Sequence, residues 1–211
     1  MSTYPRKLKY VAAGLALGVL VAGCATAPTV ERYVPPPIGS TYVIERKDTG
    51  SFGTTAARVP FKFLERTWQG QTVNAYEGPM GALYTRPEGG WIGVFVGGKP
   101  MVTWDPPLNW DWPISVGKSW TKTYRMTNHA RNQTVSYDAS LKVESYEEIK
   151  VPAGTFKVFR ISNKTTLGDE NVSWYSPELG IFVKNSQRRT EKHPAGAGTR
   201  EDELVSQTIR P

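Results

Sequence analysis

Beyond Ser40, short runs rich in Val, Ile, Thr, Tyr, Phe and Trp alternate with breaks that contain Gly or Pro. Alternation of apolar and polar residues along such runs is typical of strands with one buried face. The pattern predicts twelve strands, over residues 42–47, 59–67, 72–77, 82–86, 91–96, 101–104, 119–127, 134–149, 156–165, 171–175, 181–189 and 203–209.

Turn signals separate these runs, and no convincing amphipathic helix follows Gly23. "WQGQT" and "VGGKP" place glycines where φ can be positive, and "SPELG" carries Pro177 and Gly180 at turn positions. Many short strands joined by turns indicate a mostly β fold. We expect a single antiparallel, curved sheet that forms a barrel, a half-barrel or a sandwich.

The N-terminus has the pattern of an export signal. "MSTYPRKLKY" is basic, and the 13 residues from Val11 to Gly23 are apolar. A helix of that length rises about 20 Å, which is short of the roughly 30 Å hydrocarbon core of a bilayer. Residues 1–23 are therefore predicted to be a signal peptide.

The apolar run ends in "LVAGC", and Cys24 is the single cysteine of the chain. Val21, Ala22, Gly23 and Cys24 resemble the lipobox of bacterial lipoproteins, which implies cleavage before Cys24 and acylation of its thiol with chains such as palmitate. By the same resemblance, the absence of Asp at position 25 implies the outer membrane, facing the periplasm. The alternatives are a buried, inert thiol and a plain secretory peptide with an incidental cysteine.

Residues 24–40 are predicted to be a tether and residues 41–211 a β-rich domain. "ATAPTVERYVPPPIGS" has no hydrophobic period, and its four prolines favour an extended chain. The formal charge of the chain is +7, but three basic residues lie in the signal peptide, which leaves +4. No basic stripe with interleaved aromatic residues remains, so we expect no nucleic-acid partner.

Two C-terminal segments carry a recognisable pattern, "VESYEEIKVPAGTFKVFRI" and "NVSWYSPELGIFVK". With "PISVGKSW", they resemble the uncharacterised bacterial secreted β-domains labelled TapB-like, a resemblance that supplies no activity. In "VPAGTF", Pro152 ends a strand and Gly154 permits a reversal, so Val158 and Phe159 should face opposite sides. These motifs specify a fold and hold no reactive group.

Candidate chemistry is sparse. His129 and His193 lie in polar segments without metal-ligand or catalytic spacing. "GDEN" at 168–171 and "REDE" at 200–203 favour a solvated turn and a solvated strand start over a weak calcium site. "VGKSW" lacks the first glycine of a P-loop. We therefore predict no catalytic residue, no metal ligand and no cofactor, and expect a non-enzymatic protein.

Four of the seven tryptophans lie in "TWDPPLNWDWPISVGKSW", namely Trp104, Trp110, Trp112 and Trp120. Indoles can cap an open end of a sheet, or they can form a ligand platform or a partner-binding patch. Prolines remove hydrogen-bond donors, so "DPPLNWDWP" should cross an edge or end of the sheet. Capping is favoured, and Trp110 and Trp112 are the two that could face outward to a ligand.

Together these patterns predict a lipid-anchored protein of the cell envelope. It would reach the membrane through Cys24 and act as a non-enzymatic binding or structural module, with an envelope protein or polymer as partner. The alternative is a module that handles lipids or other hydrophobic ligands in the cavity of an open half-barrel. An apolar cavity of several hundred Å³ would favour that alternative, and a solidly packed interior would exclude it.

Overall fold

A computed structural model describes residues 27–209, which contain twelve strands and no helix. The strands are β1 (Thr41–Gly50), β2 (Ala56–Trp68), β3 (Gln71–Gly78), β4 (Gly81–Thr85), β5 (Trp91–Val96), β6 (Lys99–Leu108), β7 (Ser119–Asn128), β8 (Gln133–Val151), β9 (Gly154–Thr165), β10 (Asp169–Ser176), β11 (Ile181–Arg189) and β12 (Gly198–Gln207). Every predicted strand corresponds to one of them. In this part of the chain, no helix is long and apolar enough to cross a membrane.

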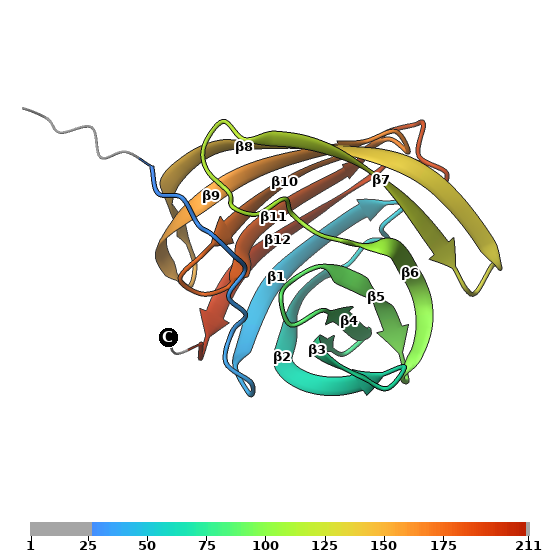
Figure 1. Cartoon of the computed structure of the whole chain (residues 1–211), viewed down its shortest axis with the longest axis horizontal. Helices are drawn as coiled ribbons and strands as arrows, with labels where there is room; N and C mark the ends of the chain where they lie inside the picture. The colour runs from blue at the N-terminus through green and yellow to red at the C-terminus, as the bar shows by residue number, and fades with distance from the viewer. Residues whose placement is uncertain (1–26, 210–211) are drawn as a thin grey trace, which may run out of the picture.

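The strands form one closed antiparallel barrel (Figure 1). Each strand pairs with its neighbours in sequence, and β1 pairs with β12 to close the sheet. This closure confirms the barrel among the three predicted forms. The alternative of an open half-barrel is wrong, because the pairing of β1 with β12 leaves no free edge there.

Strand β6 differs from the prediction, because it continues through Asp105, Pro106 and Pro107 to Leu108. The prolines are tolerated there since β6 pairs with β7 only from Val102 to Asp105. Beyond that point the missing N–H groups of the prolines remove no bond between these two strands. The crossover expected for the whole proline-rich stretch therefore begins after Leu108 and runs over residues 109–118.

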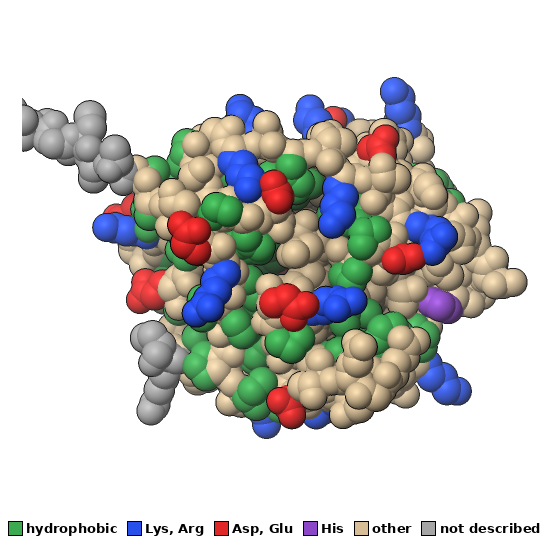
Figure 2. Space-filling model, viewed as in Figure 1, with side chains coloured by type: hydrophobic (Ala, Val, Ile, Leu, Met, Phe, Trp, Pro, Cys, Tyr) green, Lys and Arg blue, Asp and Glu red, His purple; other side chains and the backbone are tan. Residues whose placement is uncertain are grey.

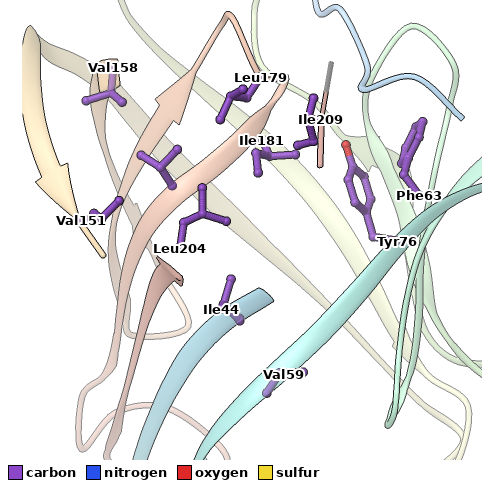
Figure 3. Close-up of a cluster of buried hydrophobic side chains, with 11 residues drawn as sticks. Ile44, Val59, Phe63, Tyr76, Val151, Val158, Leu179, Ile181, Leu204 and Ile209 are labelled. Atoms are coloured by element: carbon purple, nitrogen blue, oxygen red, sulfur yellow. The ribbon is translucent and has the colours of Figure 1, made fainter. Parts of the chain in front are cut away.

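The largest buried cluster joins segments that are far apart in sequence. It includes Ile44 of β1, Val59 of β2, Val158 of β9, Val183 of β11 and Leu204 of β12 (Figure 3). Val158 packs in this cluster, while Phe159 packs in a different one with Ile114 and Tyr175. The opposite facing of Val158 and Phe159 predicted from the "VPAGTF" turn is thus confirmed.

The segment before β1 packs against the barrel. Val30 forms both backbone hydrogen bonds with Ile114 of the 109–118 crossover, at 3.0 and 2.9 Å. Tyr33 hydrogen bonds Tyr76 through their hydroxyls. Figure 1 shows this segment and the crossover lying over the same end of the barrel. Val30 and Tyr33 of the predicted tether thus contact the barrel. The division into signal peptide, tether and domain stays a prediction, and Cys24 and the signal peptide lie outside the described residues.

Candidate functional site

The barrel encloses a cavity of about 660 Å³, lined by side chains from most of its strands. Figure 2 shows hydrophobic side chains around a hollow near the middle of one face, surrounded by charged residues. Pockets for small ligands typically measure about 300–1,000 Å³. The interior is therefore large enough for a small molecule or a short segment of a polymer.

Aromatic rings close one end of this cavity. Trp110 lies 5.0 Å from Tyr175 and 5.6 Å from Phe182, measured between ring centroids, and both contacts are edge-to-face. Trp91 of β5 lies 5.9 Å from Phe182 of β11, so side chains from these two strands meet inside the barrel. We call this group the aromatic cluster; its members are Tyr33, Trp91, Trp110, Trp112, Tyr175 and Phe182.

The structure separates the four tryptophans singled out from the sequence. Trp104, Trp110 and Trp112 line the cavity, whereas Trp120 does not. Trp120 packs beside the buried cluster around Ile114 and also lines a shallow depression on the surface. Trp110 and Trp112 are half-buried and turn toward Tyr175, so they combine a capping position with access to the interior. Ligand contact by these tryptophans stays a prediction.

Polar side chains cover the wall made by β9, β10, β11, β12 and β1. They form two cross-strand rows, in which each residue pairs in register with the next. The rows are Asn163, Asn171, Gln187, Arg200 and Asp48, and Ser173, Asn185, Asp202 and Arg46. We call Asn163, Asn171, Ser173, Asn185 and Gln187 the amide wall; all five line the cavity.

The charged members of these rows are paired with each other. Arg46 donates to both carboxylate oxygens of Asp202 at 2.8 Å. Arg200 donates to both oxygens of Asp48 at 2.7 and 2.8 Å. Such two-point contacts are the strongest arrangement of an arginine with a carboxylate, and they keep the interior close to electrical neutrality.

Two expectations from the sequence are wrong in this region. "GDEN" is not a solvated turn, because β10 begins at Asp169 and Asn171 lines the cavity. "REDE" is not solvated either, because Asp202 is buried against Arg46. Alternation places these residues on the inner face, where pairing between strands satisfies them. Among residues 27–209, no group of three or more His, Cys, Asp and Glu side chains is arranged to hold a metal ion.

His193 lies beside Asp169, and both residues line the cavity. The Nε2 atom is 3.6 Å from a carboxylate oxygen, and Nδ1 accepts a hydrogen bond from the Ala195 N–H at 3.1 Å. Thr165 donates its hydroxyl hydrogen to Asp169 rather than to the imidazole. Both ring nitrogens of His193 thus face groups of the protein itself, which favours a structural role over that of a general base.

Burial lowers the pKa of His193, Asp169 opposes this shift, and Arg189 adds to it. An unfolded His has a pKa of about 6.5 and binds its proton first as the pH falls. The free energy of unfolding should therefore decrease as the pH falls from about 7.5 to about 5.5. Urea unfolding at both pH values should show a smaller decrease for His193→Gln. An equal decrease in wild type and variant would contradict this.

Buried polar atoms without a hydrogen-bond partner in the protein gather around the cavity. Of the five such atoms in the described residues, four belong to residues that line it, namely Thr85 Oγ1, Asn163 Oδ1, the Tyr175 hydroxyl and Arg189 Nε; the fifth, Trp120 Nε1, lies elsewhere. Leaving such a group unpaired costs about 1–3 kcal/mol. A ligand with hydrogen-bonding groups would satisfy them, so the interior suits a partly polar ligand.

Sequence reasoning missed the amide wall, although a signal was present. Every residue in the segments 163–165 and 185–189 is polar, so neither face of these two strand segments is apolar. A strand of that kind in a barrel must carry polar groups inward as well as outward.

No family model and no curated protein matches the sequence, so the TapB-like resemblance receives no support. Among the solved structures that match, three cover most of the chain. A candidate lipoprotein from Parabacteroides distasonis is 14% identical, with 85% of this chain and 99% of that chain covered and a TM-score of 0.44. A candidate exported protein with a YmcC-like fold from Bacteroides fragilis is 13% identical (84% and 99% covered, TM-score 0.47). The hypothetical lipoprotein YmcC from Escherichia coli is 12% identical (83% and 89% covered, TM-score 0.40). Likeness at this level carries no conclusion about ligand or activity.

Proposed function

We propose that this protein is a lipid-anchored binding protein of the cell envelope that holds a ligand inside its barrel and catalyses no reaction. One observation carries the proposal, namely the cavity of about 660 Å³ with the aromatic cluster at one end and the amide wall along one side. Pockets that combine aromatic walls with a few convergent polar groups are typical of ligand sites.

The anchor in this proposal is Cys24, acylated and held in the outer membrane facing the periplasm. Tyr33, which lies at the aromatic end of the barrel, follows Cys24 by nine residues. Nine extended residues span at most about 30 Å, so this end of the cavity would stay close to the bilayer surface. A ligand leaving the membrane, or a polymer of the envelope, would meet this end first.

A protein that handles hydrophobic ligands is the second candidate. It is favoured by the apolar residues that line another part of the cavity, among them Ile44, Val59, Leu83 and Ile181. The closed barrel would then shield acyl chains, in place of the open half-barrel expected from the sequence.

A substitution that fills the cavity tests the proposal. Ser173 lines the cavity, whereas Val172, next to it on β10, points to the other face by alternation. Native mass spectrometry of the full chain, extracted gently from its own membranes, should show a bound non-protein molecule. Ser173→Phe should lower the bound fraction at least about tenfold, equivalent to about 1.4 kcal/mol.

Val172→Phe is the matched control and should bind like the wild type. Circular dichroism would establish that both variants fold. A folded Ser173→Phe protein that keeps the bound molecule would show that the molecule lies outside the barrel. A wild-type protein without any bound molecule would count against the proposed function.

A further inference from the structure

We infer that the ligand of the barrel is a neutral, hydroxyl-rich molecule, a short glycan segment, held between the amide wall and the aromatic side chains. This inference rests on the proposed function and names the chemical class of its ligand.

The amide wall discriminates against a purely apolar ligand. Asn163, Asn171 and Gln187 are neighbours in register across β9, β10 and β11, and all three line the cavity. An acyl chain lying on them would remove water from their amides and offer no hydrogen bond in return, which is unfavourable. Sites with buried polar groups reject ligands that cannot pair with them. Hydroxyl groups act as both donors and acceptors, so they match amide side chains.

The aromatic residues supply the other half of such a site. Sugar rings carry apolar C–H faces beside their hydroxyl groups, and these faces pack on indole and phenol rings. Phe182 and Asn185 both belong to β11, and Trp91 reaches Phe182 across the barrel at 5.9 Å between centroids. All five residues of the amide wall and all six of the aromatic cluster line the same cavity, as a glycan ligand requires.

The charges of the cavity favour a neutral ligand. Arg46 and Arg200 are each bound through two hydrogen bonds to Asp202 and Asp48. Lys184, which also lines the cavity, pairs with Glu203 at 2.6 Å. These three cations are already compensated by carboxylates of the protein. Arg189, a fourth cation that lines the cavity, stacks on the Phe52 ring at 3.8 Å and lies in the field of Asp169 and Asp48. An anionic group of a ligand would have to compete with those carboxylates, whereas a neutral ligand leaves every pair intact.

Asn163 gives the sharpest test of this inference. Its Oδ1 atom is buried and has no hydrogen-bond partner in the protein. If Asn163 served only the fold, its unpaired oxygen would destabilise the protein. A leucine of similar size at this position would then give a more stable fold. Asn163→Leu should therefore leave the thermal midpoint unchanged or higher while it weakens glycan binding, the combination expected of a binding residue.

The experiment is a fluorescence titration of the full chain, purified in detergent, because Trp91, Trp104, Trp110 and Trp112 line the cavity and report on its contents. The probes are the neutral trisaccharides maltotriose, cellotriose and N,N′,N″-triacetylchitotriose, with methyl dodecanoate as the neutral acyl probe. We expect saturable changes with at least one trisaccharide and none with methyl dodecanoate. Asn163→Leu and the second variant Asn171→Leu should each weaken trisaccharide binding at least about tenfold. Lys164→Leu, the outward-facing neighbour on β9, should bind as the wild type does.

The possible outcomes distinguish failure of the glycan inference from failure of the proposed binding function. Saturation by methyl dodecanoate without any response to the trisaccharides would overturn the glycan inference and leave a binding protein for hydrophobic ligands. Trisaccharide binding that Asn163→Leu and Asn171→Leu both leave intact would place the sugar away from the amide wall and would also overturn it. No response to either class of probe would count against both the inference and the proposed function.

Discussion

Replacing Asp48 with alanine is expected to lower the free energy of unfolding by about 3–5 kcal/mol, the range for breaking a buried ion pair by removal of one partner. The carboxylate of Asp48 is 1% exposed, and both of its oxygens accept hydrogen bonds from Arg200. Its loss would leave the Arg200 guanidinium, which is 21% exposed, without its counter-charge inside the barrel. Urea denaturation at neutral pH measures the difference.

Glu170→Ala is the matched control for this prediction. Glu170 pairs with Arg188 at 2.9 Å on neighbouring strands, but the two side chains are 39% and 63% exposed. Exposed pairs contribute at most about 1 kcal/mol, because water screens them. If Asp48→Ala and Glu170→Ala lowered the free energy of unfolding by similar amounts, water would screen the pair of Asp48 and Arg200 as it screens a surface pair.

The contrast between these two pairs shows what the sequence could predict. Strands follow from local alternation and turn residues, so all twelve were recognised, and the reversal at Gly154 follows from a single motif. The pairing of Asp48 with Arg200 joins residues 152 positions apart. It depends on closure of the barrel between β1 and β12, which no local pattern encodes.

The contacts of the tryptophan-rich segment are also beyond what a local sequence pattern predicts. Its aromatic density and its prolines predict a crossover over one end of the sheet, which holds for residues 109–118 but not for Asp105 to Leu108, where β6 continues. The partners of Trp110, which are Tyr175 and Phe182, lie on β10 and β11 and come close only in the closed barrel. A core position and a ligand site do not exclude each other here, because a side chain in a hollow barrel can face inward and still border a cavity.

Replacing Cys24 with serine should abolish the membrane association of the protein. A hydroxyl in place of the only thiol cannot be acylated by the lipoprotein pathway that the lipobox implies. Each buried methylene contributes about 0.8 kcal/mol to membrane binding, so the loss of two or more acyl chains removes the whole anchor. Metabolic labelling with a palmitate analogue, followed by membrane fractionation, should show a labelled membrane protein in the wild type and an unlabelled protein for Cys24→Ser.

Ala25→Asp is the control that separates anchoring from sorting. By the lipoprotein resemblance, an Asp after the lipidated cysteine retains the protein in the inner membrane, so this variant should keep the label and change membranes. The purified Cys24→Ser barrel should still bind the wild-type ligand, because the cavity is built from residues that follow the anchor. Unchanged labelling and fractionation of Cys24→Ser would show that another segment holds the protein at the membrane. The aromatic end of the cavity would then have no reason to lie within reach of the bilayer surface.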